Sequence, residues 1–280
     1  MTTGSPSRRN VLTLGGATLA LVACGDKGTL VACCDTGDTG DTSGTDVDWA
    51  TGGTAAMSGD YADPFETSSE STCAMVCAMT LGPCYGETVE RRDISEGYGG
   101  LPMRLALRIV DEGCEPVAGM VVDIWHAAPN GLYSGADTAE MCTEGDAEMT
   151  AGNYFRGRQT TDANGRVDFD TCFPGWYSSR AIHIHFQVRT GANEGSGEHV
   201  TSQLFFDEAL IEDIHTTHPD YLGRGRPRTS NDEDKVLGDN DPTPYTPTTA
   251  RQADGALLAW KTIVIRASLA SDLCEAPESA

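Results

Sequence analysis

The sequence contains few basic residues. Its 280 residues include 19 lysines and arginines against 42 aspartates and glutamates, which gives a formal net charge of −23 at pH 7. A protein that binds nucleic acid needs a basic surface to meet the phosphates. This balance therefore argues against nucleic acid as a partner.

The sequence also lacks, near its N terminus, a hydrophobic run long enough to cross a membrane. The apolar stretch Leu14–Val22 is too short for a spanning helix. It follows Arg8 and Arg9 and leads into a Leu-Val-Ala-Cys motif that ends at Cys24, an order typical of a twin-arginine export signal with a bacterial lipobox. We therefore expect export to the periplasm or cell exterior, removal of residues 1–23 and a lipid on Cys24 as the only membrane attachment. An ordinary signal peptide with an incidental cysteine is the alternative.

The region after the signal is poor in the apolar residues that build a core. From Asp35 to Thr72 the composition shifts to Asp, Thr, Gly and Ser, which predicts a flexible tether over residues 24–72. Calcium binding by the spaced aspartates is an alternative, but the stretch lacks a convincing calcium-loop pattern. The sequence thus divides into a signal (1–23), a tether (24–72) and a folded domain (73–280).

Cysteines are numerous, as expected of a chain exported to an oxidising compartment. There are ten, and a lipid on Cys24 leaves nine, so at least one should stay free or pair with another chain. A zinc site at Cys73 and Cys77 would require a second pair at suitable spacing, which is missing. We expect disulfides of unknown connectivity among the seven cysteines in or beside the domain: Cys73, Cys77, Cys84, Cys114, Cys142, Cys172 and Cys274.

Short alternating segments separated by turns dominate the domain, and only residues 208–214 show a helical pattern. Residues 159–161 and 167–169 should form a hairpin across the turn at 162–165. Further strands are expected at residues 103–111, 117–127, 183–189, 200–206 and 260–267. The pattern predicts an all-β fold, a β-sandwich with long loops and little helix.

His183 and His185 are the first candidates for metal ligands. They lie two residues apart in an apolar, β-branched run that predicts a strand, so both imidazoles should project from one face. By itself such a pair is weak evidence for a metal site, because a strand with one polar face gives the same pattern.

Two tyrosines strengthen the metal hypothesis. Tyr177 follows the turn 174–176, and Tyr133 follows the turn 130–132 at the end of another strand. Imidazoles alone would suit zinc, copper or iron. A phenol has a pKa of about 10 and ligates well only when a strongly acidic cation displaces its proton. Two phenolates with two imidazoles therefore favour Fe(III).

Five sequence blocks occur together in a characteristic order. They are Val-Val-Asp-Ile-Trp-His-Ala (121–127), Gly-Leu-Tyr-Ser-Gly (131–135), Arg-Gly-Arg-Gln-Thr-Thr-Asp (156–162), Pro-Gly-Trp-Tyr (174–177) and His-Ile-His (183–185). In these blocks the chain resembles the intradiol ring-cleavage dioxygenases. The resemblance covers residues 81–207 and extends more weakly to the last strand near Ile265. Several blocks in order are far more specific than any one of them.

The resemblance implies one non-haem Fe(III) per domain, held by Tyr133, Tyr177, His183 and His185. Tyr177 would be the axial ligand that dissociates and accepts a proton when a catechol binds. Arg180 would lie beside the substrate, and Gln203 matches a glutamine of the family; as catalytic residues, both would stabilise the charge that develops during the reaction. The implied reaction cleaves a catechol-type ring between its two hydroxylated carbons with O2 and gives a muconate-type dicarboxylic acid.

The other histidines are not expected to bind metal. The family places a histidine at the position of His126 outside the coordination sphere, so we assign it a structural role near the core. His199, His215 and His218 occur among charged and turn residues and are expected to face solvent.

Four questions stay open at this point. Cys84, beside Tyr85, replaces an aromatic residue of the family, which makes the fit of a substrate uncertain. The long segment 216–249 either helps to close the site or is a decorative loop. The competing hypothesis for the whole chain is a non-catalytic, transthyretin-like β-sandwich lipoprotein that binds a ligand or partner. The sequence does not predict the oligomeric state.

Overall fold

The computed structural model describes Met1 and residues 48–67, 73–191 and 196–277. The expected export signal, Cys24 and most of the predicted tether lie outside the described residues. Among the described residues, no helix is both long enough and apolar enough to cross a membrane.

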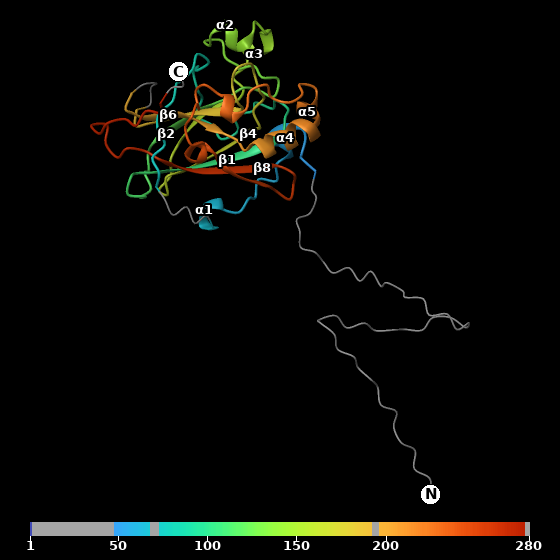
Figure 1. The fold of residues 1–280 in the computed structure, drawn as a ribbon, viewed down its shortest axis with the longest axis horizontal. Coiled ribbons are helices and arrows are strands. Elements are labelled where there is room, and N and C mark those ends of the chain that lie inside the picture. Colours follow the sequence, from blue (N-terminus) through green and yellow to red (C-terminus); the bar gives the residue numbers. More distant parts are fainter. Residues whose placement is uncertain (2–47, 68–72, 192–195, 278–280) are drawn as a thin grey trace. The chain divides into compact units, whose positions relative to one another are not determined.

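Two four-stranded sheets make up the fold (Figure 1). The first has the order β4 (Arg166–Cys172), β1 (Pro102–Val110), β8 (Leu257–Val264) and β7 (Thr248–Arg251). In it β1 and β8 are parallel, and the other neighbours are antiparallel. The second sheet is entirely antiparallel, with the order β3 (Arg156–Thr160), β2 (Val121–Trp125), β5 (His183–Arg189) and β6 (Glu198–Phe205).

Alternation along the strands divides core from site. Ile184, Phe186 and Val188 of β5 share one hydrophobic core with residues of β1 such as Leu105 and Leu107. Because successive side chains of a strand point to opposite faces, the intervening His183 and His185 face away from that core. One strand thus supplies both core packing and the candidate ligands.

In the part of the chain that the structure describes, helices are few and short. They are α1 (Pro64–Thr67), α2 (Glu140–Thr143), α3 (Ala147–Ala151), α4 (Glu208–Thr217) and α5 (Pro219–Leu222), with 3-10 turns η1 (Gly53–Ala56), η2 (Asn231–Glu233) and η3 (Thr243–Tyr245). Figure 1 shows α2 and α3 on one side of the two sheets and α1 on the other. The expected helix at 208–214 is α4, whose first turn is capped by the carboxylate of Asp207. The all-β prediction is confirmed.

Three strand predictions differ from the structure. The hairpin expected between residues 159–161 and 167–169 is wrong, because the chain crosses from one sheet to the other at the turn: β3 pairs with β2 in the second sheet, and β4 pairs with β1 in the first. The strand expected to begin at residue 117 begins at Val121, because Gly119 has a positive φ of 78° and Pro116 forms only an isolated bridge with Val110. The sequence pattern also gave no sign of β7, a four-residue edge strand with exposed ends.

The predicted tether differs as well, because residues 48–67 pack against the domain. Trp49 Nε1 donates to Asp213 at 3.0 Å, and Tyr61 Oη donates to Asp254 at 2.8 Å. Three aromatic rings of the segment each lie under an arginine: Trp49 under Arg251, Tyr61 under Arg104 and Phe65 under Arg166. The composition of this region, rich in Asp, Thr and Gly, did not predict these few contacts of Trp49, Tyr61 and Phe65.

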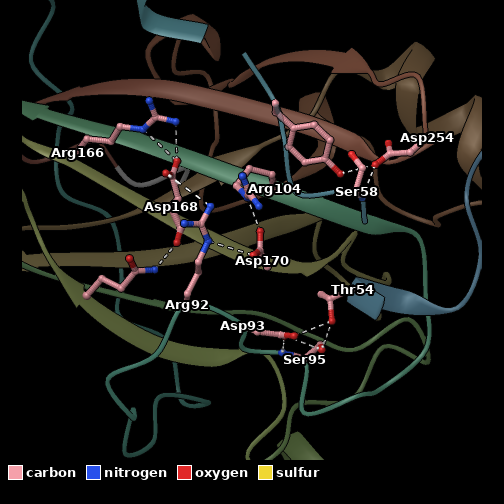
Figure 2. A network of polar contacts seen from close by, with 12 residues as sticks. Thr54, Ser58, Arg92, Asp93, Ser95, Arg104, Arg166, Asp168, Asp170 and Asp254 are labelled. Atoms are coloured by element: carbon pink, nitrogen blue, oxygen red, sulfur yellow. Dashed lines mark hydrogen bonds and ion pairs between the residues drawn. The ribbon is translucent and has the colours of Figure 1, made fainter. Parts of the chain in front are cut away.

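The surface that receives this segment is a network of charged side chains on β1, on β4 and at Arg92, which precedes β1 (Figure 2). Asp170 accepts from Arg104 and, at 3.1 Å, from Arg92, while Arg166 bonds Asp168 at 3.0 Å and the segment's Asp63 at 2.9 Å. The alternating polar face of the first sheet is therefore covered by residues 48–67.

Among the cysteines that the structure describes, three disulfides link Cys73 to Cys114, Cys77 to Cys274 and Cys84 to Cys142. Cys172 is free and buried. The preference for disulfides over a zinc site is confirmed for these cysteines, and the connectivity is a result that the sequence could not supply.

Candidate metal centre

The four predicted ligands meet at one point. Nε2 of His183 lies 3.1 Å from Tyr177 Oη, 3.4 Å from Tyr133 Oη and 3.1 Å from Nε2 of His185. Tyr133 and both histidines are buried, and Tyr177 is partly exposed. The structure therefore brings together residues that are separated by up to 52 positions in the sequence, from Tyr133 to His185.

Two glycines allow the tyrosine-bearing loops to approach each other. Gly131 has a φ of +84°, and a Cβ there would lie 2.3 Å from the Trp176 carbonyl oxygen. A Cβ on Gly175 would lie 2.4 Å from the Pro129 carbonyl oxygen. Any side chain at either position would push the loops, and with them the two phenols, apart.

The arrangement of donors fits a cation. Nδ1 of His183 lies 2.7 Å from the Ala181 carbonyl oxygen, which only accepts, so Nδ1 carries the proton and the lone pair of Nε2 points to the centre. One lone pair can accept one hydrogen bond, yet three polar atoms lie within 3.4 Å of it. A cation between these atoms would satisfy all of them.

The charge states indicate which cation. Burial raises the pKa of Tyr133 well above its ordinary value and also raises the pKa of Tyr177. Burial, with a smaller effect of Arg180, lowers the pKa of His183 to about 3, and burial and His183 lower that of His185. All four groups are thus neutral at pH 7, and only a strongly acidic ion such as Fe(III) would displace both phenolic protons.

The tyrosines are essential to this site. Within the described part of the chain, no group of three or more His, Cys, Asp or Glu side chains could hold a metal ion. Two imidazoles alone would make an incomplete site, so a metal at this point would also need the two phenols as ligands.

Arg180 lies at the edge of the centre, as predicted. Its Nη1 lies 3.5 Å from Nε2 of His183, and its Nη2 donates to Oε1 of Gln203. Gln203 stands on β6 directly opposite His185 and donates through Nε2 to the Thr80 carbonyl oxygen at 3.0 Å. Both amide atoms of Gln203 are therefore in use, and one of them holds Arg180.

The comparisons with known proteins agree with this geometry. The structure is similar to that of an intradiol ring-cleavage dioxygenase from Tetranychus urticae, with a TM-score of 0.60 and 27% identity over 72% of this chain and 98% of that chain. A sequence model of a family described as Dioxygenase matches residues 82–237, more than half of the chain. The chain belongs to the intradiol ring-cleavage dioxygenase family.

Curated members of the intradiol family match a smaller part of the chain. The chain is 28% identical to a chlorocatechol 1,2-dioxygenase of Pseudomonas putida over 144 residues, which are 44% of this chain and 49% of that protein. It is 31% identical over 106 residues to a protocatechuate 3,4-dioxygenase beta chain of Burkholderia cepacia, which are 35% of this chain and 42% of that protein. The chain thus spans about half the length of the curated relatives it matches.

Asp234 is a residue at this intradiol-type site that the sequence did not reveal. Its Oδ2 accepts from Arg180 Nε at 2.8 Å and from the Ala181 amide at 2.6 Å. Burial alone would raise the pKa of Asp234, but the charge of Arg180 and these hydrogen bonds outweigh it and lower the pKa. Asp234 lies in the segment 216–249, which therefore contacts the site, but no local pattern distinguishes it from its acidic neighbours.

The segment around Cys84 also borders the site. A Cβ on Gly82 would lie 3.0 Å from Cε1 of His185, so this backbone packs directly on the imidazole. The disulfide from Cys84 reaches Cys142, whose carbonyl oxygen accepts from the Tyr133 amide at 2.8 Å. The residue that departs from the family pattern thus joins two walls of the candidate site.

Arg156 is a second residue whose place the sequence did not predict. It is fully buried, its guanidinium carbon lies 5.9 Å from the centre of the Tyr133 ring, and Nε donates to the Ser134 carbonyl oxygen at 2.6 Å. Burial lowers its pKa to about 10, so it stays charged at pH 7. A fixed positive charge behind Tyr133 favours a phenolate there.

The remaining histidines serve the fold. His126 bonds the Ala127 carbonyl oxygen and Thr171 Oγ1, each at 2.8 Å, so its structural role is confirmed. The expectation that His199, His215 and His218 face solvent is wrong, because all three are buried. Each lies within hydrogen-bond distance of a backbone carbonyl oxygen outside its own local segment: that of Arg266 for His199, Gly225 for His215 and Ala50 for His218. No local sequence pattern predicts these contacts.

Proposed function

We propose that this protein is a non-haem Fe(III) intradiol dioxygenase. It cleaves a catechol-type ring between its two hydroxylated carbons with O2 and produces a muconate-type dicarboxylic acid. The observation that carries the proposal is the convergence of two phenols and two imidazoles on one point. Membership of the intradiol family supports it.

Tyr133, Tyr177, His183 and His185 would hold the iron. When bound, Fe(III) supplies the Lewis acidity that favours a doubly deprotonated catechol and prepares its ring for attack by dioxygen. Tyr133 is buried and packs close to Arg156, which suits a permanent ligand. Tyr177 is partly exposed, so its Oη is the phenolate best placed to leave and to accept a catechol proton.

Arg180 would stabilise the negative charge that develops on substrate oxygens. Its Nη1 points at the centre, and its Nε and Nη2 are held by Asp234 and Gln203. A fixed donor of this kind lowers the barrier because it needs no reorganisation during the reaction. Gln203 contributes by holding Arg180, since both of its amide atoms are already bonded.

The non-catalytic alternative, a transthyretin-like binding protein, is not favoured. All four donor side chains and Arg180 are present and converge, whereas a binding module has no need of this set. The two sheets share one core, which supports a β-sandwich with the site formed by β5 and the loops before it.

The reaction can be tested by product analysis. We expect the ferric protein to consume O2 with catechol or a substituted catechol and to yield an acyclic dicarboxylic acid. With isotopically labelled O2, mass spectrometry should find both labelled atoms in that product. No O2 uptake by iron-loaded protein across a panel of catechols would contradict the proposal and favour the binding module.

We also propose that the chain is exported and lipid-anchored. Three disulfides support an oxidising compartment, while Arg8, Arg9 and Cys24 lie outside the described residues. Cys24→Ser should release the protein from the membrane fraction, and a protein that is already soluble with Cys24 intact would contradict the anchor.

A further inference from the structure

Asp234 is a buried carboxylate with every oxygen occupied by this chain. It is 1% exposed. Oδ2 accepts from Arg180 Nε and from the Ala181 amide, and Oδ1 accepts from the amides of Val236 at 2.9 Å and Leu237 at 3.1 Å. Buried carboxylates are rarely retained unless they are paired, and here the partner is the cation at the edge of the metal centre.

The loop around Asp234 is firmly fixed. Ser230 and Glu233 form a capping box at η2, and Asn231 bonds the Phe206 carbonyl oxygen at 2.8 Å. On the other side, Leu237 is part of the hydrophobic core. The position of the Asp234 carboxylate is therefore set by the fold and does not depend on Arg180.

Arg180, by contrast, depends on its partners. Its side chain is 15% exposed, and its planar guanidinium is held at Nε by Asp234 and at Nη2 by Gln203. These two contacts leave Nη1 directed to the centre, 3.5 Å from Nε2 of His183. Without the carboxylate, the guanidinium would be free to rotate toward solvent.

We propose that Asp234 is a positioning residue that fixes the guanidinium of Arg180 toward the substrate, so that the segment 216–249 completes the active site. This inference rests on the proposed dioxygenase function. Because Asp234 has no free atom for the substrate, it acts only through Arg180. Its loss should lower kcat and leave the affinity for catechol and the binding of iron nearly unchanged.

The first test compares full-length, iron-loaded Asp234→Asn with the wild-type protein, using catechol as substrate. We expect kcat to fall roughly 10- to 100-fold, the effect of misplacing one oriented donor, with KM within about threefold of wild type. Asp234→Glu, which keeps the charge but moves it, should show a similar loss and guards against a failure of the first variant to fold.

A matched control removes another buried carboxylate–arginine pair. Asp123 is fully buried, lies on the same face of the second sheet as the two histidines, and accepts from Arg189 at 2.8 Å and from Thr88. Asp123→Asn should lower the unfolding temperature about as much as Asp234→Asn but leave kcat within about threefold of wild type. An equal fall in kcat in both variants would show that the effect is general destabilisation and overturn the proposal.

A double-mutant cycle tests whether Asp234 acts through Arg180. In Arg180→Ala, the further change Asp234→Asn should reduce kcat no more, because the group that Asp234 positions is already gone. Independent, additive losses would overturn the proposal. So would a loss of iron in Asp234→Asn that parallels the loss of activity.

One measurement does not require turnover. In the iron-free protein, the Nε–H proton of Arg180 should exchange slowly in an NMR spectrum, and the exchange should become fast in Asp234→Asn. Wild-type protein that fails to cleave any catechol would contradict the proposed function, yet this signal would still report on the positioning of Arg180. Equal exchange rates in the two proteins would contradict the inference.

Discussion

At the scale of single residues, the two tyrosines of the centre are not equivalent. Tyr133 is buried between the other ligands and Arg156, whereas Tyr177 is partly exposed. Tyr133→Phe should therefore lose most of the iron, while Tyr177→Phe should keep it but turn over at least about tenfold more slowly, because a proton acceptor is lost. Iron content per chain and kcat with catechol check this. The reverse order of iron loss would contradict the assignment of roles.

Residue-level prediction from the sequence worked where local pattern decides the outcome. His183 and His185 share a face because a strand alternates, and their run of apolar neighbours predicted that strand. Prediction failed where the partners of a residue lie far from it in the sequence. Nothing near Asp234 distinguishes it from other acidic residues, and the burial of His218 depends on Ala50, 168 residues away.

At the scale of elements, two of the disulfides close loops of similar size. Cys84–Cys142 closes 58 residues and Cys73–Cys114 closes 41, so loop-closure entropy gives each about 4 kcal/mol of stabilisation. Only the first joins the backbone over His185 to the loop of Tyr133. Replacing either pair by alanine should lower stability similarly, but only loss of Cys84–Cys142 should raise KM for catechol, by roughly tenfold.

Steady-state kinetics of the two double variants measure KM for catechol, and chemical denaturation measures their stability. Equal KM values would mean that the Cys84–Cys142 link has no influence on the site. The sequence alone could not provide this prediction, because connectivity among seven cysteines depends on which strands become neighbours.

The segment 48–67 is a second element whose contribution can be measured. It places three aromatic rings under arginines and ties Asp63 to Arg166. A chain that begins at residue 68 should melt roughly 5–10 °C below one that begins at Asp48, as measured by calorimetry. If the two chains melted together, the packing of this segment would contribute nothing to stability, as the prediction of a flexible tether implied.

At the scale of the whole molecule, stability should fall as the pH decreases below about 6.5. Burial lowers the pKa of both His126 and His215 to about 4. A lowered folded-state pKa means that the unfolded chain binds more protons between the two values, so stability is full above the unfolded pKa and is lost toward the folded one. Each histidine should remove about 2 kcal/mol between pH 7.5 and pH 5.

Chemical denaturation of iron-free protein at the two pH values measures this loss. His126→Gln should reduce the difference between pH 7.5 and pH 5 by about 2 kcal/mol relative to wild type. An unchanged difference would show that His126 is not held in its neutral form.

The fold as a whole followed from short alternating segments, which is why the all-β prediction succeeded. The pairing of the strands could not be predicted in the same way. For example, β1 and β8 are parallel neighbours although about 150 residues separate them, and no local sequence pattern encodes that contact. The four candidate ligands could be predicted because they lie in sequence blocks that resemble the family. The loop of Asp234 could not, because the segment 216–249 contains no such block.

The most direct measurement is the visible spectrum of the purified chain after ferric loading, before and after catechol is added without oxygen. We expect a tyrosinate-to-iron charge-transfer band that shifts when catechol binds, and a much weaker band in Tyr133→Phe. A protein that stays colourless after ferric loading would contradict the ferric site and, with it, the dioxygenase function.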